Sequence, residues 1–291
     1  MMGRSETTGS AEQTRLNAGE RAQVLVEALP YIKRFHGQTV VVKLGGAAME
    51  EGKSDTLLDV VLLRYVGMHP VLVHGGGHEI TAMSERLGLK PEFRNGLRVT
   101  DASTIEVVKM VLTGKINPDL VASLNRLGAQ AVGMSGEDGA SIIAKPQDAN
   151  LGFVGRVTQV NPEPITALID GGYVPVIASI GLGYDGNAYN INADTVAAEL
   201  AVALRAAKLV LLTDVPGVLG PDQRVLSELR RADAAEMLRS QAISGGMIPK
   251  LEACLRALDG VPSAHVLDGR LPHALLLELF TESGIGTMVL P

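Results

Sequence analysis

Two apolar segments that each end in consecutive glycines constrain the fold of this chain more than any other feature. Residues 40–49 read VVVKLGGAAM, a β-branched run typical of a buried strand, and they place Lys43 just before a glycine pair. Residues 71–77, VLVHGGG, repeat the design with three glycines ahead of a helical stretch. Glycine lets the backbone turn and approach a ligand closely. The sequence therefore predicts two similar turns at neighbouring strand ends.

Such a pair of turns favours an anionic ligand. Consecutive glycine N–H groups at the start of a helix form a concave array of donors that suits phosphate oxygens. Lys43 would add a positive charge at the end of its strand. We therefore predict a polyphosphate ligand, although each run by itself could be no more than a tight strand-to-helix turn.

From Val40 onward, strands and helices alternate. The expected strands are 40–44, 70–74, 130–134, 174–180, 208–214, 264–267 and 287–290, with a hairpin that joins 141–145 to 154–160. The expected helices are 55–67, 78–87, 103–113, 118–127, 162–172, 193–206, 232–241, 245–259 and 272–281, with a loop at 96–101. Asn117 and Pro118 stand in the cap and first-turn positions of one helix. This alternation predicts an α/β fold, a three-layer αβα sandwich around a central, mainly parallel open sheet, with ligands at the carboxyl ends of its strands.

The region before the first strand reads as a tail and a helix. Residues 1–16 are expected to form a disordered tail, and 17–36 a helix opened by Asn17. Pro30 should kink this helix or split it in two, because its ring opposes the carbonyl of the previous turn. An apolar stripe follows helical spacing at Leu25, Leu29 and Ile32. The stripe needs a partner surface, either in its own domain or on another subunit.

Composition limits the possible partners. A net charge of −6 without a block rich in Lys and Arg argues against nucleic acid or an anionic membrane as the main partner. The single cysteine, Cys254, fits a buried thiol in a reducing compartment, and no Cys/His cluster has zinc spacing. The first 20 residues contain no apolar run of signal-peptide length, and nowhere do 18 uninterrupted apolar residues occur. We therefore expect a soluble, cytoplasmic protein.

Two motifs point to other nucleotide folds, but their contexts do not fit. GLGYDG at 181–186 matches the dinucleotide pattern, yet the residues after it do not continue a helix and Asp214 stands farther along the chain than that pattern requires. GKS at 52–54 resembles the end of a Walker A loop, but Ala47 occupies the position of its first glycine. An NAD-dependent oxidoreductase and a P-loop enzyme are therefore weaker hypotheses.

Three further stretches carry polar groups where an α/β sheet would present them. NINAD at 190–194 puts Asp194 at a helix start, where it could instead be an ordinary N-cap. GGMIPK at 245–250 places Lys250 near the start of a helix, although a helical lysine is more often solvated. Arg98 in NGLRVT is suited to grip a carboxylate with two parallel hydrogen bonds.

Taken together, KLGG, HGGG, NGLRVT, NINAD, LLTDVPGVL and GGMIPK resemble the amino acid kinase family in type and order, over about residues 20–291. They specifically resemble the members that phosphorylate the γ-carboxylate of N-acetyl-L-glutamate in arginine biosynthesis. The resemblance implies an N-lobe at 37–207 that binds N-acetyl-L-glutamate and dimerises, and a C-lobe at 208–291 that binds ATP. The chain departs from the expected pattern at Leu44, Ala47 and His78, which bear on fine specificity.

The resemblance also implies roles for individual residues. Lys43, Lys250 and Asp194 would be catalytic, the lysines stabilising the transferring phosphoryl group and Asp194 holding them. Gly76, Gly77, Arg98, Asn190 and Asn192 would bind the substrate. Gly45, Gly46 and Gly76 would bind phosphate, and Asp214 and Lys250 the nucleotide. ATP would carry Mg2+, with no metal ligand from the protein.

Regulation is implied as well. In arginine-inhibited members, a helix like 17–36 interlaces dimers into a hexamer, a trimer of dimers, and arginine binds between that helix and the C-lobe. The residues that we predict for this allosteric site are His265, Glu278, Glu282 and Gly284.

Other members of the family remain alternatives, namely carbamate kinase, glutamate kinase, aspartokinase and uridylate kinase. Aspartokinase and many glutamate kinases carry an added C-terminal domain, which we do not expect after residue 291. A non-catalytic arginine sensor on the same scaffold is an alternative from another class, but the intact pair of lysines argues against it.

Overall fold

The computed structural model describes residues 18–46, 49, 53–94, 96–281 and 284–291. Its helices are α1 (Ala18–Phe35), α3 (Lys53–Tyr65), α4 (Gly77–Arg86), α5 (Ala102–Val111), α6 (Asn117–Arg126), α7 (Glu163–Asp170), α8 (Ala193–Ala203), α9 (Arg231–Arg239), α10 (Met247–Ala257) and α11 (Ala274–Phe280). Its strands are β1 (Thr39–Leu44), β2 (His69–His74), β3 (Phe93–Arg94), β4 (Leu97–Arg98), β5 (Ala131–Ser135), β6 (Ile142–Pro146), β7 (Gly155–Val160), β8 (Val174–Ala178), β9 (Ile180–Gly183), β10 (Ala188–Asn190), β11 (Lys208–Thr213), β12 (Glu228–Arg230), β13 (Ala264–Asp268) and β14 (Thr287–Leu290). The predicted tail at 1–16, the Asn17 cap and Ala47 lie outside these residues.

An eight-stranded sheet forms the centre of the molecule, in the order β12-β14-β13-β11-β1-β2-β8-β5. Every neighbouring pair is parallel except β13 and β14. The prediction of a mainly parallel open sheet is therefore confirmed. β1 lies between β2 and β11, and Lys43 is paired in register with Val73 and Leu211. In this sheet, the strands that come before residue 207 in the sequence are neighbours of one another, and so are the later strands. The two groups meet where β1 pairs with β11. This division fits the predicted lobes, whose boundary stays a prediction because one continuous sheet joins them.

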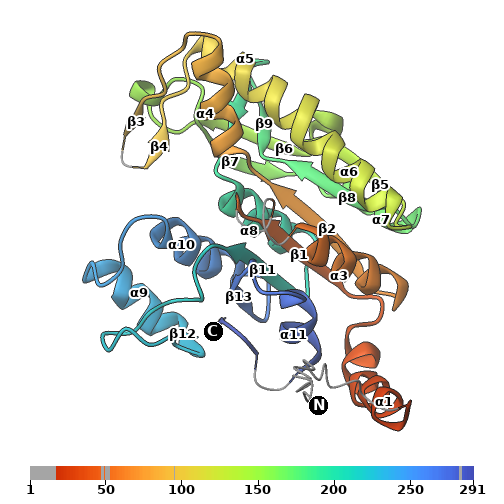
Figure 1. The fold of residues 1–291 in the computed structure, drawn as a ribbon. Helices are drawn as coiled ribbons and strands as arrows, with labels where there is room; N and C mark the ends of the chain where they lie inside the picture. Colours follow the sequence, from red (N-terminus) through yellow and green to blue (C-terminus); the bar gives the residue numbers. More distant parts are fainter. Residues whose placement is uncertain (1–17, 47–48, 50–52, 95, 282–283) are drawn as a thin grey trace, which may run out of the picture.

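Alternate residues of each central strand face opposite sides of this sheet. Val40 and Val42 pack into one core cluster, which α3, α5, α6 and α11 cover, whereas Val41 packs into a second cluster under α8 and α10. Helices therefore flank both faces (Figure 1), and the predicted three-layer arrangement is confirmed. A strand buried on both faces needs apolar residues at every position, which explains the uninterrupted valines at the start of β1.

A second, four-stranded sheet has the order β10-β9-β6-β7. It contains the predicted antiparallel hairpin of β6 and β7. The expected single strand at 174–180 is instead two strands, since β8 belongs to the large sheet and β9 to the small one. The backbone of Gly136 packs closely against the start of β9, since a Cβ there would lie 2.3 Å from the carbonyl oxygen of Ile180. β9 and β10 pair as an antiparallel hairpin around GLGYDG, so this motif is not a dinucleotide-binding turn.

The helical region from 102 to 126 is more continuous than the sequence predicts. A π-helical turn, Leu112–Ile116, joins α5 directly to α6. Asn117 has helical dihedral angles and does not act as a cap, so that prediction is wrong. Its side chain donates instead to Nε2 of His74 at 3.0 Å and to the carbonyl oxygen of Val176 at 2.9 Å. The predicted loop at 96–101 also contains a short strand, β4, which pairs with β3.

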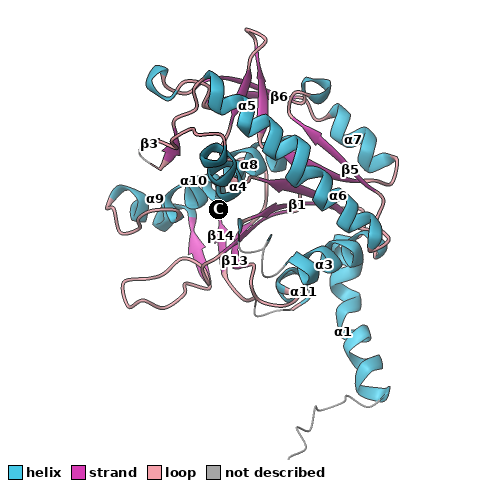
Figure 2. Cartoon of the chain, turned by 45° about the horizontal axis from the view of Figure 1, so that its top comes forward, coloured by secondary structure: helices cyan, strands magenta, loops and turns pink. Residues whose placement is uncertain are grey.

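The N-terminal helix α1 extends away from the rest of the molecule (Figure 2). It runs through Pro30 as one helix, so the proline does not split it. Leu25 is 73% exposed and Leu29 44%, whereas Phe35 at the end of the helix is buried in the core. Within this chain, the predicted apolar stripe is therefore largely uncovered, and the stripe remains available to another subunit.

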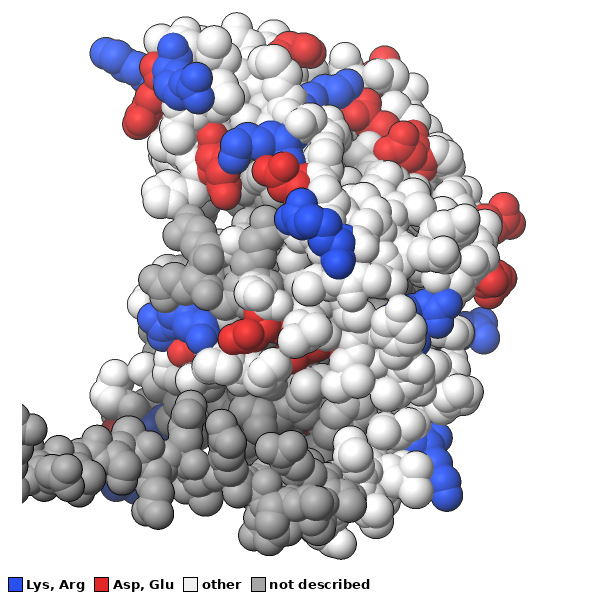
Figure 3. Space-filling view, turned by 45° about the vertical axis from the view of Figure 1, so that its right-hand side comes forward, with Lys and Arg blue, Asp and Glu red and all other residues white. Residues whose placement is uncertain are grey.

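Charged residues of both signs are interspersed on the face of the molecule that Figure 3 shows. Among the residues that the structure describes, no helix combines the length and the apolar character needed to cross a bilayer.

Candidate active site

The two glycine turns lie side by side, because β1 and β2 are parallel neighbours whose carboxyl ends share one edge of the sheet. Lys43 is buried near the end of β1. After it, Gly45 passes so close to β11 that a Cβ would lie 2.4 Å from the carbonyl oxygen of Leu212. After β2, Gly76 packs against the side chain of Ile116 and precedes the first residue of α4. The expected meeting of the two turns at one sheet edge is confirmed.

Three charged side chains from distant parts of the sequence meet at this edge. Lys43 Nζ lies 2.8 Å from Asp194 Oδ1, and Lys250 Nζ lies 3.0 Å from Asp194 Oδ2. Asp194 is in the first turn of α8 and is only 4% exposed. The helix cap is Asn192, whose side-chain oxygen accepts from the backbone N–H of Asp194 at 2.7 Å. The carboxylate of Asp194 is therefore free to pair with both lysines.

Burial and pairing act against each other in this cluster. Burial alone would raise the pKa of Asp194, but the charges of Lys43 and Lys250 outweigh it, so this pKa lies below its usual value. Burial lowers the pKa of Lys43, while Asp194 opposes that shift and Lys250 adds to it. Two ammonium groups and one carboxylate leave a net positive charge at a partly desolvated site. Such a site favours an anion between the lysines.

A cavity of about 230 Å³ opens next to this cluster. It is lined by most of the predicted catalytic and substrate-binding residues, namely Lys43, Gly76, Gly77, Arg98, Asn190, Asn192 and Asp194. Arg98 is 8% exposed, and its Nη1 is buried without a hydrogen-bond partner among the described residues. Burial lowers the pKa of Arg98. A buried, unpaired guanidinium nitrogen beside a cavity is a strong binding group for a carboxylate.

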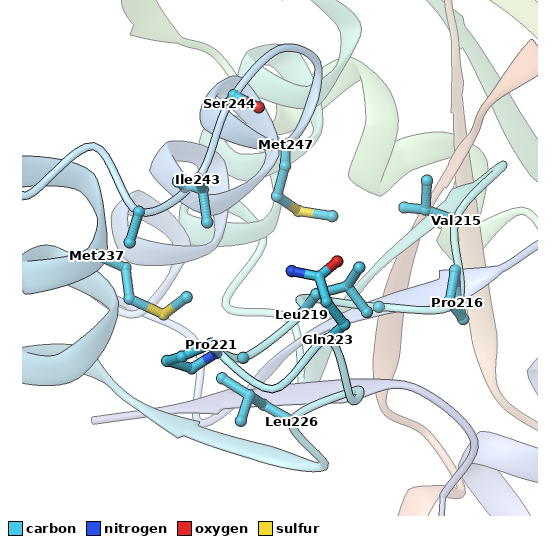
Figure 4. Close-up of a pocket in the computed structure, with 13 residues that line it drawn as sticks. Val215, Pro216, Leu219, Pro221, Gln223, Leu226, Met237, Ile243, Ser244 and Met247 are labelled. Carbon is cyan, nitrogen blue, oxygen red and sulfur yellow. The ribbon is translucent and has the colours of Figure 1, made fainter.

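A second, more apolar cavity of about 450 Å³ lies on the C-terminal side of the cluster. Met237 and Met247 point into it from α9 and α10, and Leu219 and Gln223 enter from the loop after β11 (Figure 4). Lys250 is one turn beyond Met247 on α10, so the charged cluster adjoins both cavities. The sequence predicts a nucleotide site in this half of the chain, through Asp214 and Lys250, but no sequence pattern marks the residues that line the cavity.

Asp214, predicted to bind the nucleotide, follows β11 directly and does not line that cavity. It accepts a hydrogen bond from Thr213 Oγ1 at 3.0 Å.

Residues 38–268 match the sequence profile of the amino acid kinase family. The chain belongs to this family. It is 52% identical over 280 residues to the acetylglutamate kinase of Acaryochloris marina (strain MBIC 11017), covering 94% of this chain and 99% of that enzyme. It is also 52% identical over 282 residues to the acetylglutamate kinase of Syntrophomonas wolfei, covering 94% of this chain and 98% of that enzyme.

Solved structures agree on the fold. An N-acetylglutamate synthase from Neisseria gonorrhoeae, in complex with coenzyme A and N-acetyl-glutamate, superposes with a TM-score of 0.83 at 27% identity. The match covers 93% of this chain and 63% of that chain. A carbamate kinase from Giardia lamblia bound to AMP-PNP gives a TM-score of 0.67 at 18% identity, over 87% of this chain and 98% of that chain. At that identity the likeness shows the fold alone, and the predicted amino acid kinase fold is confirmed.

His74 and Asn117 form a buried pair of side chains next to the second glycine turn, which no sequence pattern predicts. His74 ends β2, and burial lowers its pKa to about 4, so its ring is neutral at pH 7. In the neutral tautomer that fits both contacts, Nδ1–H donates to the carbonyl oxygen of Gly75 at 3.0 Å and Nε2 accepts from Asn117. The histidine of HGGG therefore holds the backbone at the start of the glycine turn, through its hydrogen bonds to Gly75 and Asn117. The motif itself is the only sequence signal for this histidine.

A third cavity, of about 660 Å³, lies between α1 and the C-terminal strands. Its lining includes Tyr31 and Arg34 of α1 together with two of the predicted allosteric residues, Glu278 and Gly284. His265 does not line it, because this side chain is fully buried behind Glu278, with Nδ1 2.6 Å from Glu278 Oε1. Glu282 lies outside the described residues.

Two of the three positions where the chain departs from the expected family pattern, Leu44 and His78, are among the described residues. Leu44 is buried in the core, and His78 is exposed on the first turn of α4.

The two glycines after β1 should respond differently to alanine. Gly45→Ala should lower the free energy of unfolding by about 1–3 kcal/mol, because its Cβ would meet the backbone of β11 and the strands would have to shift. Gly46→Ala should change it by less than about 0.5 kcal/mol, since no atom of the described residues lies within 4 Å of a Cβ there. Denaturant titrations of both variants would measure this difference, and equal losses would contradict the close approach at Gly45.

Proposed function

We propose that this chain transfers the γ-phosphoryl group of ATP to the γ-carboxylate of N-acetyl-L-glutamate. The product would be N-acetyl-L-glutamyl 5-phosphate, an acyl phosphate of arginine biosynthesis. The observation that carries the proposal is the Lys43–Asp194–Lys250 cluster. Lys43 and Asp194 line the polar cavity, and Lys250 follows Met247 of the apolar cavity on α10. Identity of about 52% to acetylglutamate kinases over nearly the whole chain supports the choice of substrate.

The chemistry needs no general base. The attacking γ-carboxylate is already ionised at pH 7, since the pKa of an ordinary carboxyl group is about 4. One of its oxygens forms a bond to the γ-phosphorus, the bond from this phosphorus to the β–γ bridging oxygen breaks, and ADP leaves with the electron pair. Catalysis then depends on aligning two anions and on neutralising charge on the transferring group.

Each part of the site has a role in this reaction. Lys43 and Lys250 approach the phosphoryl oxygens from two sides, and Asp194 holds both ammonium groups in place. The backbone N–H groups of the two glycine turns would donate to phosphate oxygens. Arg98 and Asn190 would bind N-acetyl-L-glutamate. Mg2+ would arrive with ATP and reduce the charge on its phosphates.

The two cavities support the assignment of lobes. The residues that line the polar cavity all fall within 37–207, the part that would bind N-acetyl-L-glutamate. Residues 208–291 contribute the apolar cavity, where the adenine ring would lie.

A panel of acceptors tests the function. Acyl phosphate should be trapped by hydroxylamine when N-acetyl-L-glutamate and ATP are supplied, and much less with glutamate, aspartate, carbamate or UMP. Preference for another acceptor would favour carbamate kinase, glutamate kinase or a further branch of the family. ATP left unconsumed with every acceptor would favour a non-catalytic sensor.

We also propose that the enzyme is a hexamer, a trimer of dimers, that arginine inhibits. A trimer of dimers needs two different contact surfaces, and two helices carry separate exposed apolar stripes. On α1 these residues are Leu25, Val26 and Leu29, and on α3 they are Leu58, Leu62 and Tyr65. The cavity beside α1 offers Glu278 as an acidic group for a guanidinium. Arginine bound there would contact α1 and the C-terminal strands together.

One substitution tests the role of Arg98 in binding the acceptor. Arg98→Lys should raise the KM for N-acetyl-L-glutamate by about 10- to 100-fold, because lysine keeps the charge but loses the planar fork and the free Nη1. The KM for ATP should change little, since Arg98 lines only the polar cavity. Steady-state kinetics with each substrate varied would measure the split. Equal rises in both constants would place Arg98 outside the acceptor site.

A further inference from the structure

The guanidinium of Arg98 is held at one end and free at the other. Nη2 donates to the carbonyl oxygen of Gly77 at 2.8 Å and to Thr81 Oγ1 at 2.7 Å. Nη1 is buried and has no partner among the described residues, and Arg98 is one of the residues that line the polar cavity. The ring of Phe93 lies 4.7 Å from Cζ and covers one face of the group. The direction of Nη1 therefore depends on the contacts of Nη2.

Thr81 is oriented so that it can only accept from the arginine. It lies on α4, and its hydroxyl donates to the carbonyl oxygen of Gly77, four residues back, at 2.9 Å. Because that proton is used, the lone pairs of Oγ1 face Nη2. Within the described part of the chain, Thr81 is the side chain that accepts a hydrogen bond from this guanidinium. The carbonyl oxygen of Gly77 accepts hydrogen bonds from both Thr81 and Arg98, so these three residues are all hydrogen-bonded to one another.

The main chain of Arg98 is fixed separately. Thr100 is fully buried, and its Oγ1 donates to the carbonyl oxygen of Arg98 at 3.0 Å. The backbone N–H of Thr100 donates to the carbonyl oxygen of Leu151, and its carbonyl oxygen accepts from the N–H of Phe153. With the backbone held there, the remaining freedom of Arg98 is rotation about its side-chain bonds. Thr81 restricts that rotation at the far end.

We propose that Thr81 is a positioning residue for acceptor binding, which aims Nη1 of Arg98 at a carboxylate of the substrate. This inference rests on the proposed function. The γ-carboxylate must face Lys43 and Lys250 to react, so Arg98 would bind the other carboxylate of N-acetyl-L-glutamate. Without the Thr81 hydroxyl, Nη2 keeps one partner instead of two, and the guanidinium can turn away from the bound acceptor. The loss should appear in acceptor binding and not in the transfer step.

The test compares two substitutions at Thr81 with a matched control. Thr81→Ala should raise the KM for N-acetyl-L-glutamate by about 5- to 10-fold, with the KM for ATP and kcat nearly unchanged. Thr81→Ser, which keeps the hydroxyl, should behave as the wild type. Ser123 offers the control, because its hydroxyl also donates to a carbonyl four residues back, that of Asp119, and accepts from an arginine, Arg126. Ser123→Ala should leave all constants unchanged.

A double substitution decides whether Thr81 acts through Arg98. In an Arg98→Lys background, Thr81→Ala should raise the acceptor KM by less than about 2-fold, because the contact that it removes is already absent. Full additivity would overturn the proposal, as would a wild-type acceptor KM in Thr81→Ala. A fall in kcat or in Tm shared by Thr81→Ala and Thr81→Ser would indicate a structural role only. If the wild-type protein does not phosphorylate N-acetyl-L-glutamate, the proposed function fails instead, and that result is read before any variant is made.

Discussion

Replacing Lys43 or Lys250 with alanine should lower turnover of N-acetyl-L-glutamate by at least about 100-fold while the protein remains folded. Each lysine supplies a preorganised positive charge at the transferring phosphoryl group, and Asp194 holds both at 2.8 and 3.0 Å. Removing one leaves Asp194 paired with the other, so the carboxylate is not left buried without a partner. Single-turnover measurements at saturating substrates would isolate the transfer step from binding.

Two further variants make this prediction sharper. Lys43→Met keeps the aliphatic volume at a buried position, so an inactive but stable Lys43→Met protein would separate lost charge from lost packing. Lys109→Ala removes a lysine that pairs with Glu137 at 3.1 Å on another part of the molecule, and it should retain wild-type turnover. Either catalytic-site variant turning over at the wild-type rate would remove that lysine from the mechanism.

Deleting residues 1–34 should yield an active dimer that arginine no longer inhibits. The deletion removes the exposed stripe of α1 and two residues of the cavity beside it, Tyr31 and Arg34. It stops before Phe35, whose buried ring belongs to the core. The catalytic cluster is formed by β1, α8 and α10 and should be unaffected. Light scattering and inhibition assays would measure the two expected losses together.

A point substitution separates assembly from ligand binding. Leu25→Asp places a charge on the exposed stripe but leaves Tyr31 and Arg34 in the cavity. Loss of the hexamer and of inhibition in this variant would tie inhibition to assembly. A truncated protein that is still hexameric, or still inhibited, would show that α1 is ordinary packing and that this account of regulation is wrong.

The sequence predicted the sheet and the charged cluster well for physical reasons. Strands buried on both faces leave continuous apolar runs, as at the start of β1, and glycines mark where such strands open onto a ligand. Because parallel strands present their ends at one edge, the local motifs around Lys43 and His74 had to lie together. The position of Lys250 beside Asp194 could be predicted only from the family resemblance, because nothing in the sequence around Lys250 fixes its distance from Asp194.

Other features depended on contacts that no local pattern records. Asn117 before Pro118 has the sequence of a helix cap, but its amide bonds to His74 and the chain stays helical through a π-helical turn. Asp194 has the sequence of a cap too, yet Asn192 takes that role. The apolar cavity is lined by side chains from α9, α10 and the loop after β11, whose spacing in the sequence has no period.

The register of β1 against β11 has a mechanical consequence. These strands are joined by backbone hydrogen bonds in one continuous sheet, so no flexible linker separates the two halves there. Any movement of residues 37–207 relative to residues 208–291 would have to twist the sheet where β1 pairs with β11. Lys43 lies in this strand pair, next to Leu211, and would hardly move, whereas Lys250 belongs to the C-terminal half and reaches Asp194 across it. A nucleotide carried by the C-terminal half would thus meet a lysine of that same half, which Asp194 already holds beside Lys43.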